Sequence, residues 1–119
     1  MTVQVRNADN ITIVDCSGEI DLDSSTHFRD ELMKVIQAGG PSVLVNLKEV
    51  GYIDSSGIAT LVEALQRSRQ TQTRFGLFAL RSNARSVLEL ARLQTVFNIF
   101  KDEKEAVAKI ASTRPFDGL

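Results

Sequence analysis

Short apolar runs alternate along this chain with longer segments in which apolar residues recur at helical spacing. Such alternation is typical of strands separated by helices, which are normally joined in parallel by right-handed crossovers. The expected strands lie at residues 3–6, 11–17, 42–47, 75–80 and 97–100. We therefore predict an α/β fold with a mixed, mostly parallel β-sheet and about four helices, in the order β-β-α-β-α-β-α-β-α.

Turn and cap residues mark where several of these elements end. The polar segment Asn7-Ala8-Asp9-Asn10 separates the first two strands and predicts a hairpin. Gly39-Gly40-Pro41 ends the first helix, and a turn is expected through Lys48-Glu49 after the central strand. Residues 97–100 are expected to form another inner strand, before a last helix capped by Asp102.

The chain has the size and composition of one globular domain. It has 119 residues, of which 43% are hydrophobic and 24% charged, and a net charge of -1. We assign residues 1–112 to the domain and residues 113–119 to a flexible C-terminal tail. The lack of excess positive charge argues against direct binding of nucleic acid. Because no apolar run reaches about 18 residues and no signal-peptide pattern occurs, we expect no membrane insertion and a cytoplasmic location.

The sequence offers little for catalysis or for holding a metal or cofactor. Cys16, expected as a buried thiol, and His27 are single, so the usual zinc ligands are missing and a catalytic triad would depend on one imidazole. Gly-rich nucleotide-binding loops are absent. Glu19, Asp21 and Asp23 alternate along an extended segment and resemble a cation site, but a solvated strand end is the simpler interpretation. We expect no enzyme activity, catalytic residue, metal or cofactor.

The segment Asp54-Ser55-Ser56-Gly57 lies where a strand region is followed by the second helix. One polar side chain is enough to cap a helix, and Asp54 or Ser55 could do so. Here three polar side chains precede a glycine that leaves the backbone approachable. A serine at a helix N-terminus also lies where free amides and the helix dipole stabilise a phosphate. From the residues alone, a plain cap and a regulatory phosphoserine both remain open.

Several segments, in order, resemble the STAS domain family, and within it the bacterial anti-sigma factor antagonists, also called anti-anti-sigma factors. The main ones are Gly18-Glu19-Ile20-Asp21, Val43-Leu44-Val45-Asn46-Leu47 and the signature Tyr52-Ile53-Asp54-Ser55-Ser56-Gly57-Ile58. Weaker similarities occur at Val87-Leu88-Glu89-Leu90-Ala91 and Phe97-Asn98-Ile99-Phe100. The resemblance covers nearly the whole chain and implies a single-domain, STAS-like fold.

The resemblance implies a partner-switching cycle in the regulation of transcription. An unphosphorylated antagonist binds an anti-sigma factor that is also a serine kinase, and so frees the sigma factor. The kinase then phosphorylates the antagonist, and the complex dissociates. A metal-dependent serine phosphatase resets the cycle. The family's acceptor directly follows the signature aspartate, which corresponds to Ser55 here.

The resemblance also implies roles for the neighbouring residues. Asp54 would shape the acceptor loop, and Ser56 would be a supporting hydroxyl and a weaker candidate acceptor. Gly57 would allow the kinase to approach closely, and Asp21 would lie beside the acceptor. The partner-binding surface expected from the family comprises Asp21, Asp23, Asp54, Ser56, Gly57, the exposed start of the second helix at Ile58, Ser82 and Asn83.

Two features depart from the family pattern. Ala59-Thr60 occur where many relatives have a second small glycine, and the loop Leu22-Asp23-Ser24-Ser25-Thr26 is more acidic and hydroxylated than expected. Because neighbouring side chains decide which kinase fits, these departures leave the partner open. One alternative is a non-switching STAS adaptor of a membrane transporter or other signalling complex. Another is a STAS domain that binds a small nucleotide or a lipid.

Overall fold

The computed structural model of the chain describes residues 1–113. Its elements follow the predicted order. The strands are β1 (Thr2–Ala8), β2 (Ile11–Ile20), β3 (Ser42–Ile53), β4 (Arg74–Phe78) and β5 (Asn98–Phe100). The helices are α1 (Ser25–Gln37), α2 (Ser55–Gln70), α3 (Ser82–Leu90) and α4 (Glu103–Lys109), and a short 3-10 helix, η1 (Ile110–Ser112), follows α4.

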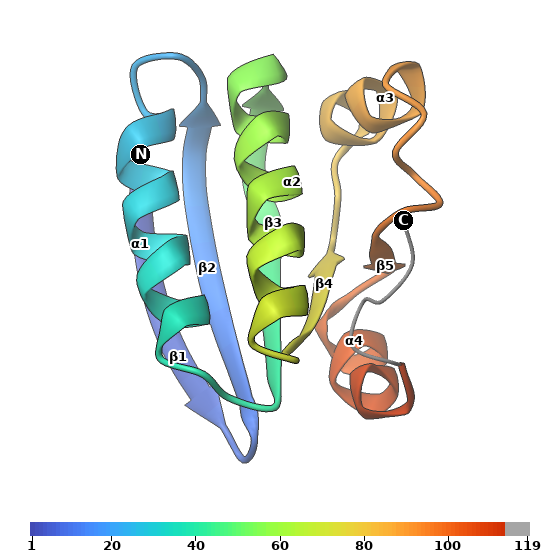
Figure 1. Cartoon of the computed structure of the whole chain (residues 1–119). Coiled ribbons are helices and arrows are strands. Elements are labelled where there is room, and N and C mark those ends of the chain that lie inside the picture. Colours follow the sequence, from blue (N-terminus) through green and yellow to red (C-terminus); the bar gives the residue numbers. More distant parts are fainter. Residues whose placement is uncertain (114–119) are drawn as a thin grey trace.

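The strands form one mixed, mostly parallel sheet, which confirms the predicted α/β class. Their order in the sheet is β1-β2-β3-β4-β5 (Figure 1). β1 and β2 pair as an antiparallel hairpin, whereas β2, β3, β4 and β5 are parallel. β5 is therefore at an edge of the sheet, and the expectation that residues 97–100 form an inner strand was wrong.

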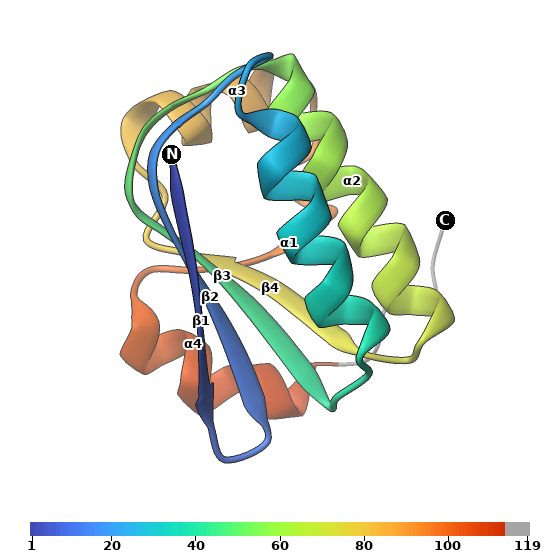
Figure 2. The ribbon, with the colours of Figure 1, turned by 90° about the vertical axis from the view of Figure 1, so that its left-hand side faces the viewer.

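Helices cover both faces of the sheet. Figure 2 shows α1 and α2 side by side on one face and α4 on the other. The larger apolar core, which includes Phe28 of α1 and Leu61 of α2, lies on the first face, and α3 contributes to it through Leu88. A smaller core on the second face joins Phe78 of β4 to Ala106 of α4. The chain thus forms a layered fold whose strand ends remain free to carry a site.

The paired ends of β2 and β3 extend beyond their other neighbours in the sheet, β1 and β4. β4 pairs with β3 only from Ser42 to Asn46, whereas β2 accompanies β3 as far as Ile53. The turn expected at Lys48-Glu49 is absent, because β3 continues through these residues as an extended strand. The pairing with β2 instead shifts register beside Gly18, whose φ of +108° is strained for other residues.

Two expectations from the sequence concern the C-terminal tail, residues 113–119, and membrane insertion. Thr113, the first residue of the expected tail, is held by a 2.6 Å hydrogen bond from Arg74 Nε to its carbonyl oxygen. Residues 114–119, the rest of that tail, lie outside the described residues. Within residues 1–113, no helix has the length and apolar character required to cross a membrane.

Candidate functional site

Asp54 caps the N-terminus of α2, as the sequence allowed. Its Oδ1 accepts hydrogen bonds from the backbone amides of Ser56 at 2.9 Å and Gly57 at 3.4 Å. It also accepts one from the Ser56 hydroxyl at 2.5 Å. The Ser56 hydroxyl is the main cause that lowers the pKa of Asp54, and the two amides add to it. Asp54 is therefore held as a carboxylate whose oxygen is already engaged.

Ser55 is the first residue of α2, and its side chain is exposed. Within residues 1–113, no hydrogen-bond partner of its hydroxyl is found, whereas the hydroxyl of Ser56 is bound to Asp54. The start of a 16-residue helix also places free amides and the positive end of the helix dipole beside Ser55. The two adjacent serines thus differ, and Ser55 is the one that presents an unengaged hydroxyl.

The loop between β2 and α1 lies directly against this cap. The backbone amide of Asp54 donates a 3.1 Å hydrogen bond to the carbonyl of Ile20, the last residue of β2. The backbone amide of Leu22 also contributes to lowering the pKa of the Asp54 carboxyl. The structure therefore brings together the two strand ends that the sequence separates by more than 30 residues.

Asp21 organises that loop from within. Its Oδ1 accepts hydrogen bonds from the amide of Asp23 at 3.0 Å, the amide of Ser24 at 3.1 Å and the hydroxyl of Ser24 at 3.2 Å. The same hydroxyl donates a 2.7 Å hydrogen bond to the carbonyl of Glu19. The Asp23 side chain, by contrast, is exposed. Asp21 therefore fixes the loop, and Asp23 faces solvent.

Ser82 and Asn83, at the start of α3, belong to the same region but differ in orientation. The Asn83 Oδ1 accepts a 2.7 Å hydrogen bond from the backbone amide of Ile53, at the end of β3. Ser82 is exposed. Asn83 thus holds the strand that leads into the cap, while Ser82 is available on the surface.

The burial of Gly57 and Ile58 differs from the expectations that Gly57 would allow the kinase to approach closely and that Ile58 marks the exposed start of α2. Both are buried. A Cβ on Gly57 would lie 2.5 Å from Cγ1 of Ile53 and 2.7 Å from Cγ2 of Ile20. The helix therefore needs a glycine here to pack on the ends of β2 and β3, and neither residue is part of the exposed surface.

Two exposed apolar side chains near the cap were not among the predicted site residues. Leu22 is 78% exposed in the β2–α1 loop, and Tyr52 is 43% exposed, two residues before Asp54. In the sequence, Leu22 stands out only as an apolar residue inside an acidic and hydroxylated loop. Tyr52 belongs to the signature but carried no assigned role.

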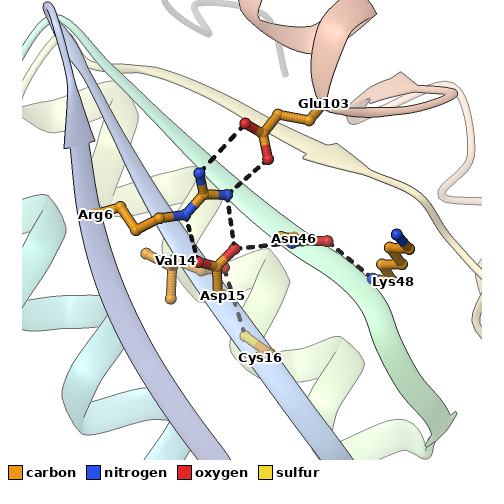
Figure 3. A network of polar contacts seen from close by, with 7 residues as sticks. All are labelled: Arg6, Val14, Asp15, Cys16, Asn46, Lys48 and Glu103. Carbon is orange, nitrogen blue, oxygen red and sulfur yellow. Dashed lines mark hydrogen bonds and ion pairs between the residues drawn. The ribbon is translucent and has the colours of Figure 1, made fainter.

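A separate polar cluster lies on the sheet face that carries α4. Figure 3 shows Arg6 of β1 between Asp15 of β2 and Glu103 of α4. Its Nε donates to Asp15 at 2.5 Å and its Nη2 to Glu103 at 2.6 Å. Asn46 donates to Asp15 at 2.8 Å. The hydrogen bonds from Arg6 are the main cause that lowers the pKa of Asp15. Because Arg6 also bonds to Glu103, this cluster of charged groups connects the β1–β2 hairpin to α4.

The residues considered for metal binding or reactivity are not arranged for either role. Among residues 1–113, no three His, Cys, Asp or Glu side chains are grouped as metal ligands. The Asp21 carboxylate is directed at amides of its own loop, and His27 is exposed. Cys16 is buried, as predicted, and burial followed by the charge of Asp15 raises its pKa to about 12. Its thiol is therefore unreactive at neutral pH.

Comparisons with known proteins agree with the fold. The anti-sigma-B factor antagonist of Listeria monocytogenes is 29% identical over 103 residues, which cover 87% of this chain and 90% of that protein. An anti-sigma factor antagonist from Mycobacterium paratuberculosis superposes with a TM-score of 0.85 at 22% identity, covering 92% of each chain.

Two solved structures of SpoIIAA, one unphosphorylated and one phosphorylated, have a similar fold. The unphosphorylated anti-sigma factor antagonist SpoIIAA gives a TM-score of 0.77 at 17% identity, covering 94% of this chain and 98% of that one. The phosphorylated Bacillus form gives 0.70 at 18% identity, covering 92% of this chain and 99% of that one. The family model described as the STAS domain matches residues 2–106. The chain therefore belongs to the STAS domain family.

Proposed function

We propose that this chain is an anti-sigma factor antagonist that acts in the cytoplasm by partner switching. In its unphosphorylated form it binds an anti-sigma factor with serine kinase activity, and phosphorylation of Ser55 releases it. A metal-dependent serine phosphatase restores the binding form. The chain itself is a regulatory protein without enzyme activity. The observation that carries the proposal is the exposed hydroxyl of Ser55 at the start of α2 in a STAS domain, for which residues 1–113 supply no hydrogen-bond partner.

The difference between the two serines supports Ser55 as the acceptor. Phosphoryl transfer forms a bond between Ser55 Oγ and the γ-phosphorus of the kinase's ATP, breaks the bond to the leaving ADP oxygen and passes the hydroxyl proton to a base of the kinase. The hydroxyl of Ser56 would first have to leave Asp54, to which it is bound at 2.5 Å. Ser55 has no such bond among residues 1–113, so transfer to it leaves the helix cap intact.

The surroundings of Ser55 supply a physical reason for release. A phosphate adds about -1.5 to -2 charges at neutral pH. It would join the carboxylate of Asp54, next in the chain, and the carboxylate of Asp21 in the loop against the cap. In the free protein, water and the N-terminal end of α2 stabilise these charges. A partner that covers them removes the water, which strengthens their mutual repulsion and disfavours the complex.

The direct test is phosphorylation in the presence of ATP by each purified anti-sigma factor kinase of the source organism. Intact-mass measurement should show one added phosphate on the wild type and on Ser56→Ala, and none on Ser55→Ala. Equal labelling of wild type and Ser55→Ala would reject the acceptor. A permanent complex with a membrane transporter, unaffected by phosphorylation, would support the adaptor function instead.

A further inference from the structure

We propose that Leu22 is the apolar anchor of the surface that the kinase covers when it acts on Ser55, and that this partner offers Leu22 an apolar socket. The inference rests on the proposed function and adds to it the chemistry of the contact. Leu22 lies in the β2–α1 loop, which is separate in sequence from the proposed acceptor Ser55.

Leu22 is exposed on a loop whose backbone is held in place. The side chain is 78% exposed, yet hydrogen bonds within the loop hold its backbone. The Asp21 carboxylate receives the amides of Asp23 and Ser24, and the Ser24 hydroxyl donates to the carbonyl of Glu19. Single exposed apolar residues are common on protein surfaces, but the loop that carries Leu22 is also held by this network of hydrogen bonds. A side chain fixed in this way loses little loop freedom when a partner covers it.

The position of Leu22 puts it within reach of any protein that acts on Ser55. Its backbone amide lies near enough to the Asp54 carboxylate to favour the charged form of that group. The amide of Asp54 in turn bonds to the carbonyl of Ile20 at 3.1 Å. A kinase must contact the Ser55 hydroxyl, and a stable interface covers about 800 Å² on each partner. Such a footprint, centred on Ser55, includes the loop that carries Leu22.

Leu22 is the exposed large apolar side chain of this loop, and it lies next to the exposed carboxylate of Asp23. The carboxylate of Asp21 and the hydroxyl of Ser24 are already used inside the loop. Because an ion pair made by an exposed carboxylate such as that of Asp23 contributes little, a partner gains most here by burying apolar surface, which favours a socket lined by apolar side chains. Tyr52, 43% exposed on β3, adds a second apolar side chain two residues before Asp54.

An apolar contact beside Ser55 also explains why phosphorylation would weaken binding. A phosphate dianion is strongly hydrated, and burying a charge without a partner is costly. A phosphate on Ser55 would therefore retain water at the interface between Leu22 and the apolar socket of the kinase. The same contact would thus bind the unphosphorylated protein and reject the phosphorylated one.

The test measures the affinity of each purified anti-sigma factor kinase of the source organism for four unphosphorylated forms of the full chain by calorimetry. The forms are the wild type, Leu22→Ser, Leu22→Met and the matched control Leu90→Ser. Leu90, at the end of α3, is 85% exposed and lies outside the braced loop. Loss of a buried leucine should weaken binding roughly tenfold or more in Leu22→Ser. Leu22→Met should stay within about threefold of wild type, because it keeps the apolar volume.

The outcomes separate this inference from the proposed function. Full affinity of Leu22→Ser, with Ser55 still phosphorylated, would overturn the anchor and leave the proposed function standing. An equal loss in Leu90→Ser would also overturn it, because the effect would not be specific to the loop. If no kinase binds the wild type, the proposed function fails and the anchor fails with it. Thermal melting of each variant, expected to match wild type, excludes loss of folding as the cause.

Discussion

The side chain of Asn83 accepts a 2.7 Å hydrogen bond from the backbone amide of Ile53, 30 residues earlier in the chain. β4 pairs with β3 no further than Asn46, so the end of β3 has a strand neighbour on the β2 side alone. The Asn83 carbonyl oxygen supplies the acceptor that a neighbouring strand would otherwise provide. Through this bond, the start of α3 helps to fix the strand that carries Asp54 and Ser55.

Replacing Asn83 by Ala should therefore loosen the end of β3. The amide of Ile53, a fully buried residue, would lose its acceptor, at a cost of about 1–3 kcal/mol. Hydrogen exchange followed by NMR should show faster exchange at Ile53. Asn83→Asp, which keeps an acceptor oxygen at the same place, is the matched control and should retain most of the protection. Unchanged exchange at Ile53 in Asn83→Ala would contradict the bond's role.

The bond also marks a limit of inference from the sequence. Asn83 was predicted as a partner-binding residue, but nothing local indicates that its side chain turns toward a strand 30 residues away. That contact depends on how far β4 extends, which is set by the pairing of the whole sheet. The order of elements and a cap at Asp54 or Ser55 were predictable, because apolar spacing and cap chemistry are local properties.

Gly57→Ala should destabilise the protein, although alanine favours helix more than glycine by about 1 kcal/mol. The added Cβ would lie 2.5 Å from Ile53 Cγ1 and 2.7 Å from Ile20 Cγ2, and both isoleucines are fully buried. Overpacking of this kind usually costs about 1–3 kcal/mol. Urea denaturation should show the loss, whereas Gly40→Ala, with no atom within 4 Å of the new Cβ, should cause little or none. Equal stability of the two variants would indicate that α2 shifts freely on the strands.

The sequence also misled about β3 for a physical reason. Lys48-Glu49 are polar residues after an apolar run, which suggested a turn, and the structure shows that both are exposed. In the structure, this part of β3 lies beyond β4, so its polar side chains can face solvent while Val50 and Ile53 remain buried. The packing requirement at Gly57 was hidden for a similar reason, because it depends on how closely α2 approaches two distant strand ends.

The free energy of unfolding at low pH should show how much the Arg6–Asp15 ion pair contributes to stability. The pKa of Asp15 is lowered in the folded protein, so the pair stabilises above the pKa of the unfolded state, near 3.9. That contribution is lost as the pH falls from about 4 through the lower folded-state value. Because both groups are partly exposed, it should amount to about 1 kcal/mol at neutral pH.

Urea denaturation from pH 7 to pH 2.5 can measure this effect. Asp15→Asn should be less stable than wild type at pH 7, and the difference should shrink below about pH 4. Asp30→Asn is a suitable control, because Asp30 is exposed and lies 3.9 Å from Arg29, the atoms being Oδ1 and Nη1. A difference for Asp15→Asn that does not change with pH would show that the charge of Asp15 contributes nothing to stability.

The most direct test of the switch is the affinity of the kinase for the two forms of the chain. Calorimetry would measure the affinity of the kinase for the unphosphorylated protein and for protein phosphorylated at Ser55. The variant Ser55→Ala, incubated with ATP, would be measured in the same way. Ser55→Ala should remain bound in the presence of ATP, and the phosphorylated wild type should bind at least about tenfold more weakly than the unphosphorylated form. Equal affinity of the two wild-type forms would contradict the account.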